Sequence, residues 1–396
     1  MKKKMSVFLA IVLFLDCVAL IALWIAPDGS NSLGIDAQQP EYGETVQSTT
    51  AEQVFSRASF VAVGDNLIHD TIYEQAAERT SGDGYDFSYD YENMEKYISA
   101  PDVAILNQET IISTEHNPSS YPTFNSPVEL GEEMLEIGFD VFNISTNHSL
   151  DKGEKGLIST INYWKDKQAI TTGAYLNKED MMPIRTNEVN GITVAYLGFT
   201  ESTNGLKLPD DSEVVLMLAK DEALLEARVK QAAEIADFVV VNAHWGVEYT
   251  HEPNDFQRQL ASKLASWGAD VIIGTHPHVI QPLEYIQNED GRKTLVAYSL
   301  GNFISAQNRG PRMLGGMLNF ELVKNNITGA TSIEKVSFSG VVTHYGSGYS
   351  NIRVYALKDY TEELAVAHGV RSNTPSFSKE YLENILAEVI DEQFLR

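Results

Sequence analysis

An alternation of short apolar runs with helical patterns, beginning at Ser59, constrains the fold of this 396-residue chain more than any other feature. Phe256, Leu260 and Leu264 recur at helical spacing before Gly268, a typical helix stop. Strand–helix–strand alternation predicts an α/β domain with a buried, largely parallel sheet. The apolar runs predict strands at 59–65, 102–109, 140–148, 192–200, 237–245, 270–278 and 294–304.

The pattern changes after Gly315. Three runs with turns between them, at 315–323, 335–345 and 351–357, predict antiparallel strands added to the same domain. Residues 378–395 carry apolar side chains at helical spacing, which predicts an amphipathic helix at the C-terminal end.

The first 27 residues predict a membrane anchor. Lysines at positions 2 to 4 precede an apolar run long enough for a transmembrane helix, and their charge favours a cytoplasmic N-terminus. Everything after Trp24 would then lie outside the membrane. Asp16 is costly within such a helix, and it makes Cys17 a poor site for lipoprotein processing. A cleaved signal peptide is the alternative.

Three segments therefore follow one another along the chain. Residues 1–27 are expected to be a signal anchor. Residues 28–55, rich in Ser, Gly, Asn, Gln, Pro and Thr, are expected to be a flexible linker. Residues 56–396 are expected to form the globular domain.

Charge and cysteine content exclude several classes of function. The formal net charge is −26, so the surface repels nucleic acid and anionic lipid, and no nucleic-acid partner is expected. A single cysteine allows neither a disulfide within the chain nor a zinc site built from cysteines. Solubility alone is a sufficient reason for this acidity.

Five predicted strands end in residue types that bind metals. A single histidine at a strand end is more often a surface or capping residue. Five such strand ends together predict a metal site, because the loops at the carboxyl ends of strands form the functional site in α/β sheets. Imidazole and carboxylate suit Zn, Mn or Fe, and two metals sharing a carboxylate would activate water. The residues are Asp65, then Asn107 and Glu109, then Asn147 and His148 followed by Asp151, then His244 followed by Glu248, and finally His276 and His278.

Other catalytic motifs are missing from the sequence. It contains no P-loop, no dinucleotide-binding glycine pattern, no Gly-x-Ser-x-Gly elbow and no His-Glu-x-x-His helix. Gly153 and Gly156 open a predicted helix after Asp151 and are interpreted as turn glycines.

The segments 122–153, 189–200, 242–284 and 298–304 resemble the CapA family of poly-γ-glutamate capsule synthesis proteins. The resemblance runs from about Ser59 to Phe303. The family is part of the metallophosphatase-like superfamily. The resemblance therefore implies an α/β fold, a two-sheet sandwich flanked by helices, with one or two divalent metal ions (Mn, Fe or Zn) at one sheet edge. It also implies capsule synthesis membrane proteins, and polyglutamate or a wall peptide, as partners.

The resemblance also implies roles for individual residues. His148 is similar to the histidine that serves as general acid, and we expect it to act together with Asp151. Glu248, Tyr249, Asn302, Arg309 and Arg312 are expected to bind substrate. The implied metal ligands are Asp65, Asn107, Glu109, Asn147, His244, His276 and His278.

One position departs from the related phosphoesterases. Those enzymes have Asp-x-His in the first motif, and Leu67 stands here at the place of the histidine. Three hypotheses remain open at this point. The first is a metal-dependent hydrolase or transferase acting on γ-glutamyl amide bonds. The second is a non-enzymatic capsule assembly or export factor that uses its metal site to bind carboxylates or for stability. The third, which Leu67 makes less favourable, is a phosphoesterase.

Overall fold

The computed structural model of the chain describes residues 54–289 and 291–395. The predicted anchor, and all but the last two residues of the predicted linker, lie outside the described residues. Among the helices of the described part, none is both long and apolar enough to cross a membrane.

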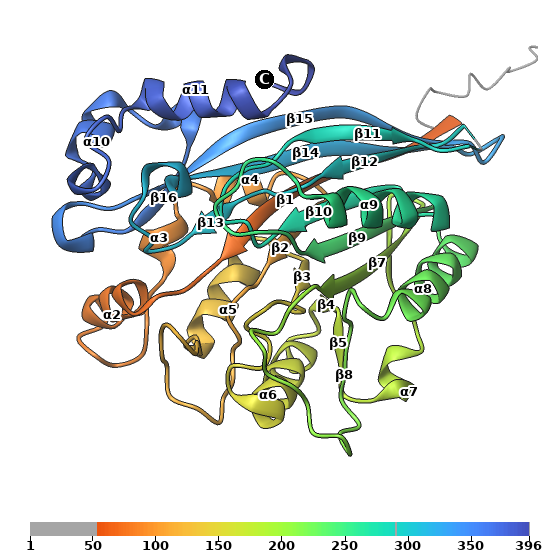
Figure 1. Cartoon of the computed structure of the whole chain (residues 1–396), viewed down its shortest axis with the longest axis horizontal. Coiled ribbons are helices and arrows are strands. Elements are labelled where there is room, and N and C mark those ends of the chain that lie inside the picture. Colours follow the sequence, from red (N-terminus) through yellow and green to blue (C-terminus); the bar gives the residue numbers. More distant parts are fainter. Residues whose placement is uncertain (1–53, 290, 396) are drawn as a thin grey trace, which may run out of the picture. The chain divides into compact units, whose positions relative to one another are not determined.

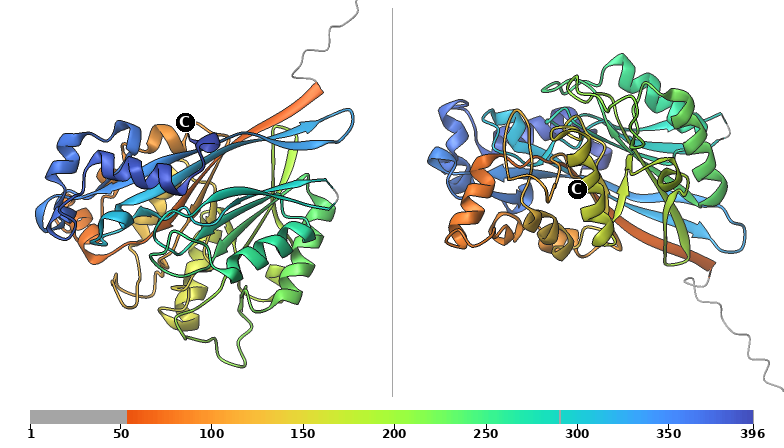
Figure 2. Two further views of the ribbon diagram at one scale, coloured as in Figure 1. Left: turned by 45° about the horizontal axis from the view of Figure 1, so that its top comes forward. Right: turned by 90° about the horizontal axis from the view of Figure 1, so that it is seen from below.

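Two mixed β-sheets form the centre of the domain, with helices around them (Figures 1 and 2). The first has eight strands, in the order β16 (Arg353–Ala356), β15 (Thr331–His344), β14 (Leu314–Asn325), β1 (Phe55–Asn66), β2 (Val103–Asn107), β3 (Val141–Asn143) and β4 (Ile170–Thr172), with β13 (Asn302–Ile304) paired to β1. The second has the order β11 (Leu283–Gln287), β12 (Lys293–Ala297), β10 (Val271–Thr275), β9 (Phe238–His244), β7 (Ile192–Thr200) and β6 (Arg185–Val189). A short pair joins β5 (Ala174–Tyr175) to β8 (Val215–Leu216).

Each large sheet combines a parallel centre with antiparallel edges. Strands β1 to β4 run parallel, as do β7, β9, β10 and β12, while β14 to β16, β6 and β11 are antiparallel to their neighbours. The expected antiparallel C-terminal strands are confirmed. The two sheets flanked by helices that the resemblance implies are present, whereas the single, largely parallel sheet expected from periodicity is wrong, because the apolar runs are divided between two sheets.

The six-stranded sheet is buried on both faces, and its side chains alternate between two cores. Val194, Tyr196 and Val240 belong to the core shared with the eight-stranded sheet. Ala195 and Val239 belong to a second core, which the sheet shares with flanking helices. Because successive side chains of a strand point to opposite faces, a continuous apolar run is the pattern that such a doubly covered sheet requires.

Helices cover the outer faces of both sheets (Figures 1 and 2). Asn254 and Gln257 form a capping box at the start of α9, and Gly268, with φ +120°, ends it where predicted. The helices are α2 (Asp70–Arg79), α3 (Ser88–Tyr91), α4 (Glu95–Ile98), α5 (Val128–Glu136), α6 (Gly153–Asp166), α7 (Lys178–Met181), α8 (Glu222–Ile235), α9 (Asp255–Trp267), α10 (Glu362–Ala367) and α11 (Lys379–Val389).

Several predicted elements end elsewhere in the structure, among them the strand predicted at 102–109, which ends at Asn107. The strand predicted at 140–148 ends at Asn143, and the one at 270–278 ends at Thr275, because the chain turns there. The strand predicted at 294–304 is two strands, β12 and β13, separated by a bend at Gly301, whose φ is +60°. The C-terminal helix stops at residue 389, because Ile390 is extended.

Candidate metal centre

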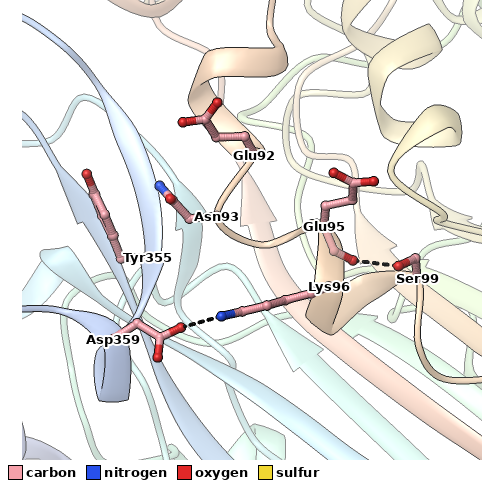
Figure 3. Close-up of a pocket in the computed structure, with 7 residues that line it drawn as sticks. All are labelled: Glu92, Asn93, Glu95, Lys96, Ser99, Tyr355 and Asp359. Carbon is pink, nitrogen blue, oxygen red and sulfur yellow. Dashed lines mark hydrogen bonds and ion pairs between the residues drawn. The ribbon is translucent and has the colours of Figure 1, made fainter.

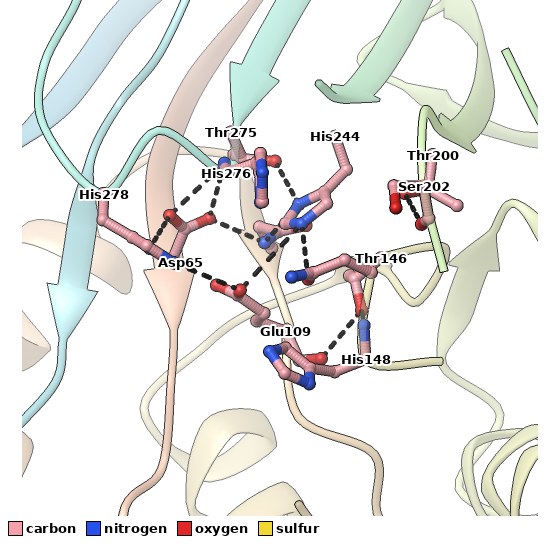
Figure 4. Close-up of polar contacts among 12 residues, drawn as sticks. Asp65, Glu109, Thr146, His148, Thr200, Ser202, His244, Thr275, His276 and His278 are labelled. Carbon is pink, nitrogen blue, oxygen red and sulfur yellow. Dashed lines mark hydrogen bonds and ion pairs between the residues drawn. The ribbon is translucent and has the colours of Figure 1, made fainter. Parts of the chain in front are cut away.

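The carboxyl ends of five strands meet at one edge of the domain. In the eight-stranded sheet, Asp65 on β1 is in register with Asn107 on β2. In the six-stranded sheet, His244 on β9 is in register with Thr200 on β7 and Thr275 on β10. The two rows touch, since Nδ2 of Asn107 lies 3.4 Å from Nδ1 of His244. Figure 4 shows their polar side chains converging.

Asp65 is the most heavily bonded side chain at this edge. Its Oδ1 accepts a hydrogen bond from Nδ2 of Asn107 at 2.9 Å, and its Oδ2 lies 3.0 Å from Nδ1 of His278. Gly64 allows β13 to approach, since a Cβ there would lie 1.8 Å from the carbonyl oxygen of Gly301. Asn302 of β13 thereby reaches the site, with Oδ1 at 3.1 Å from Nδ1 of His278.

His244 is fixed by contacts to both of its ring nitrogens. Nε2 lies 3.0 Å from Oδ1 of Asn147, and Nδ1 lies 3.1 Å from Oγ1 of Thr275. Burial, helped by the neighbouring His276 and His278, holds the pKa of His244 well below its ordinary value. The imidazole is therefore neutral, which is the form that binds metals.

Glu109, His276 and His278 form a cluster suited to a divalent cation. One ligand atom from each lies within 4.8 Å of the others. Both carboxylate oxygens of Glu109, and Nδ1 of His276, are buried without a hydrogen-bond partner among the described residues. Oε1 of Glu109 lies 3.7 Å from Nε2 of His278 and 3.9 Å from Nε2 of His244. Since buried polar atoms are normally satisfied, these orphaned atoms fit a bound metal.

Charge also marks Glu109 as a cation ligand. Burial raises the pKa of the Glu109 carboxyl well above its ordinary value, and the charges of Asp65 and Glu248 raise it further. Burial lowers the pKa of His276 to about 4. A bound divalent cation would lower the pKa of Glu109 again, and it binds the neutral imidazole that His276 already has. The two residues together therefore suit a divalent cation.

Strained backbone presents the two histidines of the 276–278 segment. His276 has φ +97° and His278 has φ +58°, which residues other than glycine seldom adopt. Such strain persists where surrounding contacts enforce it, and it is concentrated at functional sites. Here the amide of His276 donates to Asp65 at 3.2 Å, which holds the turn.

His148 and Asp151 form a hydrogen-bonded pair beside the cluster. Nδ1 of His148 lies 2.7 Å from Oδ2 of Asp151, and the same oxygen accepts from the amide of Phe124 at 2.6 Å. Phe124 packs edge-on against His148, with ring centroids 4.7 Å apart. Because Nδ1 faces Asp151, Nε2 is the nitrogen left for a substrate.

Only some of the expected substrate-binding residues lie close to one another at the site. Tyr249 lies beside His278, and the Arg312 guanidinium stacks on the Tyr249 ring at 3.4 Å from its centroid. Glu248 is exposed and is near enough for its charge to act on Glu109. The side chain of Arg309 is exposed and, among the described residues, makes no contact with the other site residues.

One site residue was not predicted from the sequence. His69, at the start of α2, stacks edge-on against Phe124 and accepts a hydrogen bond on Nδ1 from the amide of Ala306 at 3.2 Å. Burial, with a contribution from His278, lowers its pKa to about 4. Leu67, which takes the place of a metal ligand, is buried. The sequence offered one signal for His69, namely that it is a histidine shortly after Asp65.

Comparison of the sequence with known families gives one consistent result. The model of the family described as "Bacterial capsule synthesis protein PGA_cap" matches residues 59–307. The PGA biosynthesis protein CapA of Bacillus subtilis is 31% identical over 284 residues, covering 70% of each chain. The capsule biosynthesis protein CapA of Bacillus anthracis is 30% identical over 317 residues, covering 77% of this chain and 70% of its own.

Solved structures give more distant likenesses. A phosphatase from Mycoplasma pneumoniae has a TM-score of 0.45 and 12% identity, covering 73% of this chain and 94% of its own. The NAD nucleotidase of Haemophilus influenzae has a TM-score of 0.42 and 12% identity, covering 86% of this chain and 57% of its own.

Proposed function

The chain belongs to the PGA_cap family of bacterial capsule synthesis proteins, and from this premise we propose that it is a metal-dependent hydrolase or transferase of γ-glutamyl amide bonds. The substrate would be capsule polyglutamate or a wall peptide. The observation that carries the proposal is the buried cluster of Glu109, His276 and His278. Polar atoms of Glu109 and His276 have no hydrogen-bond partner among the described residues, and a bound cation would satisfy them.

The residues divide into a metal-holding group and a proton-donating pair. Glu109, His276 and His278 would hold the ion, with Asp65, Asn147 and His244 around them. A divalent ion in such a site supplies a Lewis acid and lowers the pKa of water.

His148, held by Asp151, would give a proton from Nε2 to the leaving amine. Asp151 would stabilise the protonated imidazole and fix its orientation. Arg312, stacked on Tyr249, would place a substrate carboxylate.

We also propose that the domain works outside the membrane, anchored by residues 1–27. The support is the basic start followed by an apolar run of transmembrane length. A polymer that ends on the cell surface would be accessible to a domain in this position.

A non-enzymatic role in capsule assembly or export is the second candidate. Leu67 favours it, because an apolar and buried side chain stands where related phosphoesterases have a metal ligand. In that case the metal centre would bind the carboxylates of the polymer without cleaving its amide bonds.

One experiment separates these functions. The full-length chain, purified in detergent and loaded with Mn, Fe or Zn, would be assayed on γ-linked glutamate oligomers and on p-nitrophenyl phosphate. Cleavage of the oligomer alone supports the first function, and cleavage of the ester alone overturns it. Binding of the oligomer without cleavage supports the assembly role.

A further inference from the structure

A hollow of about 440 Å³ lies beside the loop whose Asn204 accepts a hydrogen bond from Nδ2 of Asn147 at 3.5 Å. Leu150, two residues beyond His148, forms part of its wall, and the rest comes from segments 201–208 and 216–220. The amide of Glu201 donates to the carbonyl of His244 at 2.9 Å, so segment 201–208 begins next to a residue of the metal centre.

The wall of this hollow combines leucines with two lysines and a few other polar residues, among them Ser202 and Thr203. Lys207 and Lys220 are exposed, and among the described residues neither has an ion-pair partner. The one carboxylate of the wall, Glu201, accepts a hydrogen bond from the amide of Gly246 at 2.8 Å. The apolar part consists of Leu150, Leu206, Leu208, Leu216 and Leu218.

This combination selects the chemistry of a ligand. Two unpaired ammonium groups on a chain of net charge −26 make a local site for an anion. The leucines suit short methylene segments rather than a flat ring. No aromatic side chain is among the lining residues, so the hollow offers a nucleobase nothing on which to stack.

From these features we propose that the hollow is a subsite for a carboxylate-bearing acyl chain, in which the methylenes lie on the leucines and the carboxylate binds Lys207 and Lys220. The inference rests on the proposed function, because it gives one end of an extended substrate a place. Arg312 lies next to Tyr249 and His278. Figure 4 shows His278 and Ser202, a residue of the hollow's wall, at opposite sides of the centre. A chain with repeated carboxylates is thus held at both ends, with the metal cluster between them.

A second hollow, of about 650 Å³, has the opposite character (Figure 3). Its walls carry Glu92, Glu95 and Asp359. The only lysine among the lining residues, Lys96, is paired with Asp359 at 3.0 Å. This surface repels the same ligand, so charge distinguishes the two hollows.

Binding measurements on the full-length, metal-loaded chain test the subsite. The variant K207Q/K220Q is compared with K155Q/K178Q, which removes two exposed lysines outside the hollow. Calorimetry would use a γ-linked pentaglutamate and the same oligomer with its free α-carboxylates amidated. We expect K207Q/K220Q to bind the acid about tenfold more weakly, as for two exposed ion pairs, and the control to bind like wild type.

Further outcomes decide between the subsite and the proposed function. K207R/K220R should restore binding, and amidation should remove most of the difference between wild type and K207Q/K220Q. Unchanged affinity of K207Q/K220Q, equal losses for both oligomers, or no binding by wild type would overturn the subsite. Cleavage is measured in parallel. Tight binding that depends on the lysines, without cleavage, contradicts the hydrolase and leaves the subsite standing.

Discussion

Oε1 of Glu109 lies 3.7 Å from Nε2 of His278, and both side chains are buried at the meeting edge of the two sheets. Neither oxygen of that carboxylate has a hydrogen-bond partner among the described residues. A buried carboxylate without partners costs several kcal/mol unless it is neutralised or binds a cation. A divalent ion bound there would therefore stabilise the folded protein.

Replacing His276 and His278 together with alanine should remove the metal. Elemental analysis of wild type should find at least one equivalent of transition metal per chain, and the double variant should contain almost none. His116→Ala is the matched control, because His116 bonds to Ser113 away from the cluster. Equal metal content in the double variant and in wild type would show that the ion binds elsewhere.

The stability of the metal-free protein should depend on the charge of Glu109. Its pKa in the folded state is raised, so its contribution to stability is fully present below the unfolded pKa of about 4.3 and is lost as pH rises. In EDTA at pH 8, Glu109→Gln should therefore be more stable than wild type by about 1–3 kcal/mol. Urea unfolding at pH 8 and pH 4 measures this, and a variant less stable at both values contradicts it.

A second titration concerns His344, far along the chain. It is buried, Nδ1 lies 2.8 Å from the Tyr360 hydroxyl, and burial lowers its pKa to about 4. Its contribution to stability is complete above the unfolded pKa of about 6.5 and is lost as pH falls towards 4. Between pH 7.5 and 5, wild type should lose about 2 kcal/mol through this residue.

His344→Gln tests that loss, since glutamine does not titrate. The variant should unfold at a lower temperature than wild type at pH 7.5, but its melting temperature should fall less on going to pH 5. Parallel slopes for the two proteins would exclude His344 as a source of acid sensitivity. His368 remains in both proteins; its pKa is lowered to about 3, mainly by burial, and the neighbouring His344 contributes to that lowering.

The sequence predicted the strands of the site better than its loops. Hydrophobic runs mark β1, β9 and β10 because both faces of these strands are buried, and Asp65 and His244 follow from them directly. Asn147 and His148 were predicted on a strand, yet they lie in a turn in which the amide of Thr146 donates to the Ser149 hydroxyl. Local side-chain bonds of this kind leave no periodic pattern.

The same limit explains the features that were missed. His276 was predicted as a ligand, but on a strand; its backbone has φ +97°, a conformation set by tertiary contacts rather than by local propensity. Lys207 and Lys220 lie in a stretch without helical or strand periodicity, so nothing in the sequence placed them at one hollow. His69 was missed because its partners, Phe124 and Ala306, are distant in sequence.

The proposed anchor can be tested on intact cells. Protease added outside should remove the domain, and N-terminal sequencing of the membrane-bound protein should begin at the original start. The expectation follows from the apolar run that ends before Pro27 and from the lysines that precede it. A main product that is soluble and starts near Gly29 would contradict an uncleaved anchor.

His148→Ala should separate catalysis from metal binding. Nδ1 of His148 faces Asp151 at 2.7 Å, so the ring contributes Nε2 to a substrate and is not needed to hold the cluster of Glu109, His276 and His278. The variant should keep its metal and its fold, while cleavage of a γ-linked glutamate oligomer falls by about 10²–10⁴-fold, as for a lost general acid.

Loss of the ring also leaves a gap beside Phe124, so His148→Gln is the second variant. Glutamine fills more of the space and donates a hydrogen bond, but it cannot exchange a proton. A general acid requires both variants to lose activity with melting temperatures close to wild type. If glutamine restores cleavage, His148 only positions the loop through Asp151. If wild type binds the oligomer but never cleaves it, the pair serves recognition, and the assembly role becomes the better account of the protein.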